Sequence, residues 1–485
     1  MRLLFVFLDI ASVTSLSLKE EFYEEGTMKY FGTDGFRGEA NIDLTAEHAY
    51  RIGRFLGHYY QEELEKERAR GRSLPERAPI VIGKDTRRSS YMYENALATG
   101  ITTSGADAYL MHVTTTPSVS YAVRADDFSC GIMISASHNP YYDNGIKIIG
   151  PDGAKMDEEI LERIEEYIDR EKDDLPLATR EKIGMVSDYT FGRNRYIGYL
   201  MQTVRRSFKR LRIGLDCANG AAFTIAKNVF DALGAETVVI NDRPDGLNIN
   251  LEAGSTHIEG LVALVKREKL DCGFAFDGDA DRCIAVDNHG EVVDGDAIIY
   301  LCAANMKEMG QLPQNMAVTT IMSNFGLYKA LERIGIQSVK TPVGDKYVAA
   351  EMLEHGYAIG GEQSGHIIFS KYATTGDGVL TALRVTETMV ELKTDLASLH
   401  SDFVRYPQVL KNVRVKDKEA VLGNAHVKER IDQVNATLGE DGRTVVRPSG
   451  TEPVLRVMAE HLDAATCERA VEDIISAIAE AGLMA

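Results

Sequence analysis

Short apolar runs alternate with stretches of helical periodicity along most of the chain. Seven runs have the length and composition of buried strands, at 80–82, 131–134, 211–215, 237–240, 273–276, 317–321 and 357–359. Helical spacing appears at 52, 55, 56 and 59, preceded by Thr45 as a candidate N-cap, and again at 471, 474, 475 and 478. The alternation predicts α/β layers, in which ligands bind beyond the carboxyl ends of the strands.

Composition narrows the class of protein. A chain of 485 residues corresponds to about three to four domains of ordinary size. Its 44% hydrophobic content excludes a mostly disordered chain, and 42 glycines against 12 prolines exclude a collagen-like one. The net charge of −19 argues against binding nucleic acid through the overall field. Any anionic ligand must therefore be met by locally gathered Lys and Arg.

The cysteines and the N-terminus indicate the compartment. Six cysteines without a C-x-x-C pair do not form a disulfide scaffold and favour the cytoplasm. Arg2 and the apolar run 3–8 resemble a signal peptide, but Asp9 ends the run below the usual length. No apolar stretch approaches the ~20 residues needed to span a bilayer, so we expect no membrane segment. We expect residues 1–27 to lie outside the fold, with Met28 as the natural start.

Charge-dense stretches suggest where domains meet. The segments 170–182 and 403–419 read as linkers, and another boundary is expected soon after the acidic cluster at 277–281. These positions divide the chain into domains at 28–182, 183–290, 291–403 and 404–485.

Two segments near the N-terminus carry candidate chemistry. In 29–38, three glycines and Arg37 form a loop that could approach a phosphate, although the segment taken alone favours an ordinary glycine turn. In 134–140, Ser137 and His138 follow a buried strand, and 143–147 adds a further turn and Lys147. A Ser/Asn/Pro turn is the structural alternative. The hydrolase pattern G-x-S-x-G is absent here.

The third segment is acidic. Asp277, Asp279 and Asp281 stand two residues apart after an apolar strand, so their carboxylates can converge on a hard cation. An EF-hand would need Gly and Glu where the chain has Arg282 and Asn288. Three carboxylates with water or phosphoryl oxygens suit Mg²⁺, and without a cation they would repel one another.

Two further loops complete the set. The segment 360–366 offers Glu362 and Ser364 for sugar hydroxyls or an amine, and His366 for proton transfer; a glycine-rich connection with a structural His is the alternative. The segment 447–453 can ring a phosphate, or form an exposed turn before the strand 454–458. Its candidate ligands are Arg447, Ser449, Gly450 and Thr451. A Walker A motif is missing because Gly83-Lys84 is followed by Asp85, which argues against a P-loop kinase.

The five segments together, in this order, resemble the α-D-phosphohexomutase superfamily over residues 28–485. The sequences of 135–147 and 362–366 are similar to those of the bacterial branch that acts on glucosamine phosphates. The resemblance implies four domains around a central cleft: three related α/β mixed-sheet domains and a smaller α+β C-terminal domain. In that order, the domains would carry the phosphoserine loop, the metal loop, the sugar loop and the phosphate loop.

The resemblance also implies roles by position. Ser137 would be the phosphoserine, with one of its phosphate oxygens joining Asp277, Asp279 and Asp281 around Mg²⁺. Glu362 and Ser364 would bind the sugar. Arg447, Ser449, Gly450 and Thr451 would hold the phosphate that does not react. Arg37, His138, Lys147, Arg282 and His366 would line the reacting phosphate, with Lys147 and His366 as proton-transfer candidates.

The implied reaction converts glucosamine 6-phosphate to glucosamine 1-phosphate through a glucosamine 1,6-bisphosphate intermediate, on the route to UDP-N-acetylglucosamine. Mg²⁺ would be the cofactor, and glucosamine 1,6-bisphosphate or another sugar bisphosphate the activator. The partner would be a small phosphosugar in the cytoplasm. The oligomeric state stays open, with a homodimer as one outcome. Two positions depart from the usual sequence pattern of the family: Ala253 stands where relatives often have Cys, and Lys346 where they usually have Arg.

Three other functions compete. A phosphomannomutase/phosphoglucomutase would use the same machinery, and Gln363 beside Glu362 favours the amino sugar. A non-catalytic phosphosugar-binding regulator should have lost Ser137 or the aspartates, which are all present. A metal-dependent phosphatase would not need the Arg447 segment.

Overall fold

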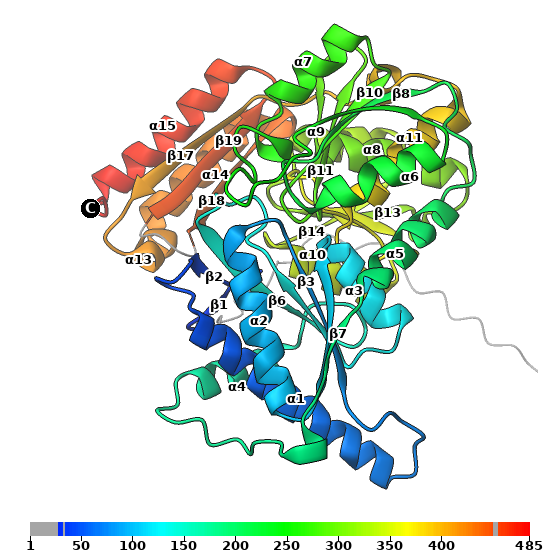
Figure 1. Cartoon of the computed structure of the whole chain (residues 1–485). Coiled ribbons are helices and arrows are strands. Elements are labelled where there is room, and N and C mark those ends of the chain that lie inside the picture. Colours follow the sequence, from blue (N-terminus) through cyan, green and yellow to red (C-terminus); the bar gives the residue numbers. More distant parts are fainter. Residues whose placement is uncertain (1–27, 33, 450–453) are drawn as a thin grey trace, which may run out of the picture.

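The computed structural model describes residues 28–32, 34–449 and 454–485. Its N-terminal unit is a seven-stranded mixed sheet in the order β1-β2-β6-β5-β3-β4-β7, drawn in the lower part of Figure 1. The strands are β1 (Phe31–Gly32), β2 (Gly35–Glu39), β3 (Pro79–Lys84), β4 (Asp107–Val113), β5 (Cys130–Ile134), β6 (Asp143–Ile149) and β7 (Val186–Asp188). The helices are α1 (Ala46–Ala69), α2 (Arg88–Thr103), α3 (Thr116–Ala125) and α4 (Glu158–Ile168). Because β7 pairs with β4, the chain leaves this unit only after residue 188.

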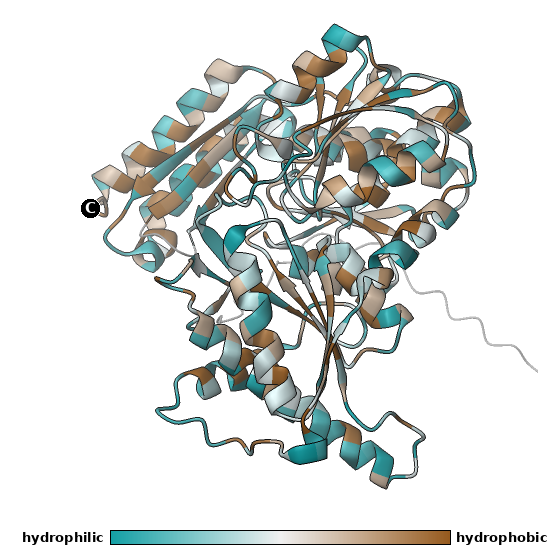
Figure 2. Cartoon of the chain, viewed as in Figure 1, coloured by the Kyte–Doolittle hydropathy of each residue, from teal (hydrophilic) through white to brown (hydrophobic). Residues whose placement is uncertain are grey.

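Helices α1 and α2 pack against each other at very close range. Helix α1 begins after Thr45, whose side chain accepts the N–H of His48 at 3.3 Å. The close approach depends on Gly53 and Gly100, since a Cβ at Gly100 would lie 2.2 Å from the carbonyl oxygen of Tyr50. The far end of α1 is largely hydrophilic in Figure 2, as expected for a helix end that extends into solvent.

The two middle units share one hydrophobic core. Their strands form a five-stranded sheet, β12-β11-β10-β8-β9, and a four-stranded sheet, β14-β13-β15-β16. The first comprises β8 (Arg212–Asp216), β9 (Glu236–Ile240), β10 (Cys272–Phe276), β11 (Cys283–Asp287) and β12 (Val292–Val293). The second comprises β13 (Met316–Thr320), β14 (Gln337–Thr341), β15 (Ile359–Gly361) and β16 (Ile367–Phe369). One buried cluster runs from Phe274 in the first sheet to Ile359 in the second, so the two sheets are packed as one body.

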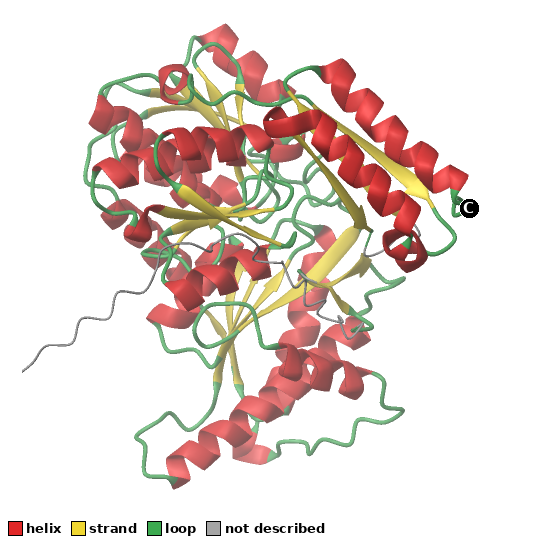
Figure 3. Cartoon of the chain, turned by 180° about the vertical axis from the view of Figure 1, so that it is seen from behind, coloured by secondary structure: helices red, strands yellow, loops and turns green. Residues whose placement is uncertain are grey.

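Helices surround these sheets, as Figure 3 shows from behind. The helices are α5 (Thr190–Thr203), α6 (Ala226–Ala232), α7 (Glu259–Glu268), α8 (Gly295–Glu308), α9 (Phe325–Arg333), α10 (Asp345–His355), α11 (Gly378–Leu392) and α12 (Leu396–Leu399). Short 3₁₀ turns occur at Arg180–Lys182, Ala221–Thr224, Gly254–Thr256, Pro313–Asn315 and Gly439–Asp441. Parallel strands with helical connections give the middle units their α/β architecture.

The C-terminal unit is smaller and has a core of its own. Its antiparallel sheet has the order β17-β19-β18, with β17 (Gln408–Arg414), β18 (Gly442–Pro448) and β19 (Val454–His461). Its helices are α13 (Lys418–Gly423), α14 (Ala425–Leu438) and α15 (Ala464–Glu480). The C-terminal unit therefore packs around its own core and does not share the core of the middle units.

Six of the predicted strands are confirmed as β3, β5, β8, β9, β10 and β13, and the two predicted helices are α1 and α15. The predicted strand 357–359 meets β15 (Ile359–Gly361) only at Ile359. The segment 29–38 is more regular than the predicted loop, because Phe31–Gly32 and Gly35–Glu39 pair as the β1–β2 hairpin, with Gly35 at φ 91° directly after its turn. The interpretation of 143–147 as a turn was wrong, because this segment is β6 and pairs with β2 and β5.

The six cysteines are all free and buried, as the apolar runs around them predict. Among the described residues, none of the helices combines the length and apolar character that a bilayer crossing requires. The predictions for residues 1–27 concern a segment outside the described residues.

Candidate active site

Segments from two sheets meet around Ser137. The segment after β5 carries Ser137, the segment after β10 carries the three aspartates, and β2 carries Arg37. Ser137 is fully buried and has a positive φ of 51°, a conformation that few non-glycine residues adopt. Such a strained backbone needs support from its surroundings, and at active sites it usually serves function.

Neighbouring side chains support this conformation through hydrogen bonds to main-chain atoms of the loop. The Oγ of Ser135 accepts the N–H of Ser137 at 2.9 Å. The carbonyl of Ser137 accepts hydrogen bonds from Arg87 at 3.2 Å and from Asn250 at 2.9 Å. Both side chains also bind the carbonyl of Asn139. The nucleophile candidate is thus fixed by groups from the first and second units.

The side chain of Ser137 points at the acidic cluster. Its Oγ donates to Oδ2 of Asp277 at 2.5 Å and lies 3.4 Å from Nδ1 of His138. Ligand oxygens of Asp277, Asp279 and Asp281 all lie within 4.8 Å of one another, and all three residues are buried. The predicted serine and the predicted metal loop are therefore in direct contact.

This cluster fits a hard divalent cation. Oδ1 of Asp279 and Oδ1 of Asp281 are buried and have no hydrogen-bond partner, so two acceptors remain for a ligand. Burial raises the pKa of Asp277 well above its usual range, and the charges of Asp281 and Asp279 add to the effect. A cation at this point would relieve the repulsion, and the all-oxygen donor set matches Mg²⁺.

Cations surround the cluster. Nζ of Lys147 lies 2.8 Å from Asp279, 3.2 Å from Asp281 and 3.2 Å from Asp34. Burial lowers the pKa of Lys147, but these carboxylates outweigh burial and raise it well above the usual value. Lys147 is therefore held protonated, as a fixed positive charge.

His138 is held neutral. Its Nδ1 lies 3.0 Å from Nη1 of Arg282, which can only donate, so Nδ1 accepts. Burial, assisted by the charges of Arg282 and Arg37, lowers the pKa of His138 to about 4. Arg37 contacts Asn139 at 3.4 Å, and Arg282 donates its backbone N–H to Asp277 at 3.1 Å. All of the expected phosphate-lining residues of the first two units thus border the Ser137 loop or the aspartates.

His366 reaches the same cluster from the third unit. Its Nδ1 lies 3.8 Å from Asp281, and its Nε2 lies 3.6 Å from Asp345. Burial lowers its pKa, but the hydrogen bond and charge of Asp281 and the charge of Asp345 raise it to about 9. In the neutral ring, Nε2 accepts the N–H of Gly376 at 3.0 Å, and the one ring proton lies on Nδ1, toward Asp281.

The sugar-binding candidates lie on the turn before His366. Oε1 of Glu362 accepts the N–H of Gly344 at 3.1 Å, and Ser364 is exposed. Gln363 donates to Asp294 at 3.1 Å, and the N–H of Gly295 donates to the carbonyl of Gln363 at 3.0 Å. The start of α8 therefore shapes this turn.

The phosphate-binding candidates come from the C-terminal unit. Arg447 lies near the end of β18 rather than in a turn, and burial together with the charge of Arg456 lowers its pKa. Ser449 is buried, and its N–H donates to Val454 at 2.9 Å. Gly450 and Thr451 lie outside the described residues. Two neighbouring arginines whose charges repel one another favour a bound anion.

Sequence reasoning missed several residues of the site. Asp34 joins Arg37, Lys147 and Lys155, and these cations lower its pKa against the effect of burial. Thr116 donates to Asp279 at 2.6 Å. Arg87 and Asn250 hold the Ser137 loop, as described above. Asp34 lies inside the segment 29–38, so its position beside Arg37 could have identified it from the sequence. The other residues lie outside all five segments and could not have been found in that way.

Comparison with known proteins places this geometry in a family. Four domain models match the chain: phosphoglucomutase/phosphomannomutase α/β/α domain I at 28–174, domain II at 194–290, domain III at 294–407 and the C-terminal domain at 410–477. The chain belongs to the phosphoglucomutase/phosphomannomutase family, within the α-D-phosphohexomutases.

Its similar relatives include a phosphoglucosamine mutase of Lachnospira eligens, 59% identical over 454 residues that cover 94% of this chain and 99% of the relative. A phosphoglucosamine mutase of Bacillus cereus is 48% identical over 455 residues, covering 94% of this chain and 99% of that one.

Two solved structures show the same fold. A phosphoglucomutase/phosphomannomutase family protein from Burkholderia thailandensis has a TM-score of 0.78 at 24% identity, with 93% of this chain and 97% of that one covered. Aspergillus fumigatus N-acetylphosphoglucosamine mutase, crystallised with GlcNAc-6P and magnesium, has a TM-score of 0.64 at 17% identity, with 94% and 97% covered. The resemblance expected from the five motifs and the expected four-domain fold are both confirmed.

Proposed function

We propose that the protein isomerises glucosamine 6-phosphate to glucosamine 1-phosphate through a phosphorylated Ser137. The observation that carries this proposal is the contact between Ser137 Oγ and Asp277, at 2.5 Å, inside a ring of cations. The full-length similarity to phosphoglucosamine mutases supports the choice of the amino sugar. A serine buried against three carboxylates would be a poor nucleophile alone, so the cations and the metal are essential to the proposal.

The reaction has two transfers. In the first, the 1-hydroxyl of glucosamine 6-phosphate attacks phospho-Ser137, the Oγ–P bond breaks, and glucosamine 1,6-bisphosphate forms as the hydroxyl loses its proton. In the second, the turned intermediate gives its 6-phosphoryl group back to Ser137, and O6 regains a proton. Phosphoryl transfer of this kind depends mainly on positioning and charge neutralisation.

The residues of the chain divide this work. We assign Arg37, Lys147 and Arg282 to the charge on the transferring group, because each is a cation that contacts the Ser137 loop or the aspartates. His366 remains our candidate for moving the hydroxyl proton. Lys147, the other candidate from the sequence, is held protonated by its carboxylate neighbours and could act only as a proton donor. We assign neutral His138 to positioning Arg282, because its Nδ1 accepts from that guanidinium at 3.0 Å beside Ser137.

The metal would be held by Asp277, Asp279 and Asp281, with an oxygen of phospho-Ser137. Bound Mg²⁺ would supply positive charge for the phosphoryl oxygens, and the oxygens of Asp279 and Asp281 that lack hydrogen bonds support its binding here.

Substrate binding would use two further loops. We assign Glu362 and Ser364 to the sugar, and Arg447 and Ser449, with Gly450 and Thr451, to the distal phosphate. The same distal clamp must accept the 6-phosphate first and the 1-phosphate after the intermediate turns. An arginine is suited to this because its fork binds either phosphate in the same way.

Other parts of the proposal concern the enzyme in the cell. A sugar bisphosphate, such as glucosamine 1,6-bisphosphate, would activate the protein by phosphorylating Ser137. We propose a cytoplasmic role in the supply of UDP-N-acetylglucosamine. Light scattering after size exclusion would separate a homodimer from a monomer.

The deciding experiment follows phosphosugar conversion by ³¹P NMR. The full chain is incubated with glucosamine 6-phosphate, Mg²⁺ and a trace of sugar bisphosphate, with glucose 1-phosphate and mannose 1-phosphate in parallel. We expect preferred conversion of the amino sugar. Preferred conversion of glucose or mannose phosphates would move the protein to the neighbouring branch of the family. Release of inorganic phosphate without isomerisation would contradict the proposal.

A further inference from the structure

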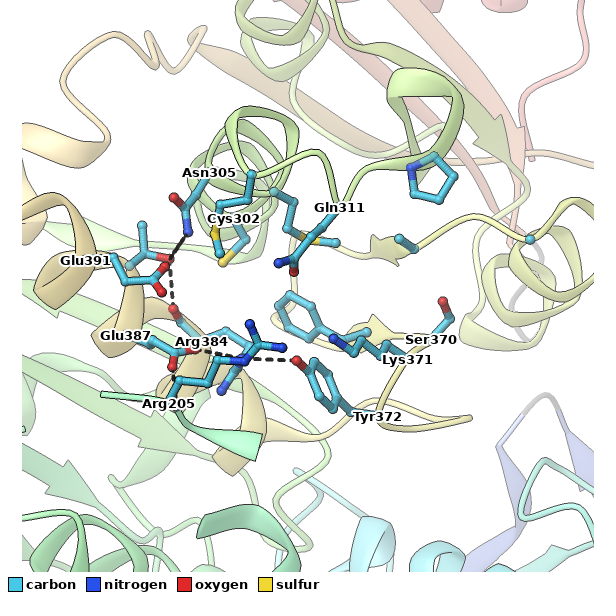
Figure 4. A pocket seen from close by; sticks show the side chains of 17 residues that line it. Arg205, Cys302, Asn305, Gln311, Ser370, Lys371, Tyr372, Arg384, Glu387 and Glu391 are labelled. Atoms are coloured by element: carbon cyan, nitrogen blue, oxygen red, sulfur yellow. Dashed lines mark hydrogen bonds and ion pairs between the residues drawn. The ribbon is translucent and has the colours of Figure 1, made fainter. Parts of the chain in front are cut away.

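A cavity of about 390 Å³ is lined in part by the segment that follows β16 (Figure 4), and none of the three aspartates lines it. Its walls come from the end of α8, from residues 369–372, from α11 and from the segment after α5. The volume falls in the range typical of pockets for small ligands, about 300–1,000 Å³. None of the five motifs contributes to it.

The cavity carries positive charge without a matching negative charge. Lys371 and Gln311 point into it in Figure 4. Glu387 is engaged by Arg384 at 2.8 Å and by the N–H of Arg205 at 2.6 Å. Within the part of the chain that the structure describes, the side chains of Arg205 and Lys371 form no ion pair with a carboxylate.

The second acidic residue of the wall is also occupied. Glu391 accepts from Asn305 at 3.3 Å and lies 3.7 Å from Arg206. Arg205 and Lys371 are exposed members of the cavity wall. In a protein with a net charge of −19, two such cations without acidic partners among the described residues favour an anionic ligand.

The rest of the wall is apolar and soft. Cys302 and Phe369 are buried, and Met306 and Tyr372 are half-buried beside them. Thioether and aromatic groups make favourable contacts with a flat ring, and they adapt to its shape. The combination of an apolar wall and a few converging polar groups is what distinguishes a ligand pocket from a packing defect.

We propose that this cavity binds an organic phosphate with a planar ring, of the size of a nucleoside monophosphate. The phosphate is held by Arg205 and Lys371, and the ring lies against Met306 and Phe369. This binding site is independent of the phosphosugar site, and the inference does not rest on the proposed function.

A short segment of the chain connects the cavity to the candidate active site. Lys371 and Tyr372 begin the segment that ends at Gly376, whose N–H contacts His366. The segment is clamped on the way, since Thr374 donates to Gly153 at 2.8 Å and Tyr199 donates to the carbonyl of Tyr372 at 2.6 Å. A ligand on Lys371 and Tyr372 therefore contacts the segment that positions His366.

Isothermal titration calorimetry with the full chain tests the site. The probes are the four ribonucleoside 5′-monophosphates, with inorganic phosphate and the unphosphorylated nucleosides as partial ligands. We expect at least one nucleotide to bind, with each of its parts binding at least about tenfold more weakly. Lys371→Met and Arg205→Met should each weaken nucleotide binding about tenfold, the effect of losing one charged hydrogen bond.

Lys428→Met, on the exposed face of α14, serves as the matched control and should leave the affinity unchanged. Titration in the presence of saturating glucosamine 6-phosphate should also leave nucleotide binding in place. Three results would overturn the proposal: no nucleotide bound up to about 10 mM, affinities unaffected by both cavity variants, or nucleotide displaced completely by the phosphosugar. The last result would assign the nucleotide to the phosphosugar site instead.

Discussion

Ser137 occupies a backbone conformation that costs free energy, and three side chains of the structure hold it there. Replacing it by Ala keeps the same backbone supports, because Ser135, Arg87 and Asn250 all bind main-chain atoms of the loop. We therefore expect Ser137→Ala to remain folded and to lose phosphosugar conversion by about 10⁴-fold or more. Far-UV circular dichroism and the ³¹P assay measure the two properties. Near-normal conversion by this variant would remove Ser137 from the transfer.

The acidic cluster makes a separate prediction at the same scale. Asp279→Asn removes one negative charge from the three, while the amide can still accept from Thr116. We expect Mg²⁺ affinity to fall by at least about tenfold, since even indirect partners of metal ligands have effects of that size. Calorimetric titration with Mg²⁺ measures it. Asp231→Asn, on the surface of α6, is the control, and equal affinities for the two variants would place the metal elsewhere.

At the contact between α1 and α2, a Gly→Ala substitution should have the opposite effect on stability from the usual one. Gly→Ala inside a helix usually stabilises a protein by about 1 kcal/mol. Gly100→Ala should instead destabilise by a few kcal/mol, because its Cβ would lie 2.2 Å from the Tyr50 carbonyl. Gly198→Ala in α5, where nothing lies within 4 Å, is the matched control and should stabilise. Urea unfolding measures both, and equal effects would show that the helices separate easily.

The start of α8 makes a pH-dependent contact with its neighbours. Asp296 is fully buried, and its Oδ2 accepts the N–H of Asn324 at 2.7 Å. Burial raises its pKa to about 7, and the charge of Glu460 adds to this against the opposing charge of Arg443. The folded state thus keeps a proton that the unfolded state has lost, so stability falls as the pH rises from about 4 to about 7.

Asp296→Asn removes that penalty. We expect the variant to be more stable than the natural chain by about 1–3 kcal/mol at pH 8, and by less at pH 5. Urea unfolding at both pH values gives the comparison. A gain of the same size at pH 5 and pH 8 would show that ionisation of Asp296 does not limit stability.

Across the whole molecule, the sequence predicts the features that depend on neighbouring residues and misses those that depend on residues far away in the chain. The three aspartates are readable because their spacing alone brings them together, and β10 is readable because its run is apolar throughout. Strand β6 was misread because Asp143-Asn144-Gly145 has the composition of a turn. Its strand conformation depends on pairing with Arg37 and its neighbours, more than a hundred positions earlier in the chain.

The missing members of the site have the same explanation. Thr116 touches Asp279, which lies 163 positions away, and Asn250 reaches the Ser137 carbonyl across 113 positions. No local pattern marks either residue, since a threonine at a helix start and an asparagine in a loop are common for reasons of capping and turns. Only the assembled sheets bring them to the site.

The distribution of hydrophobic cores leads to a last prediction, about truncation. The C-terminal unit buries its own cluster, including Val413 and Ile474, whereas Phe274 and Ile359 belong to one cluster shared by the middle units. A chain of residues 28–407 should therefore stay folded and bind Mg²⁺, yet lose phosphosugar conversion because the Arg447 clamp is gone. A chain of residues 28–290 should aggregate, because it exposes half of a shared core. Size exclusion, circular dichroism and Mg²⁺ titration compare the two. A soluble, cooperatively unfolding 28–290 chain would show that the second unit is stable without the third.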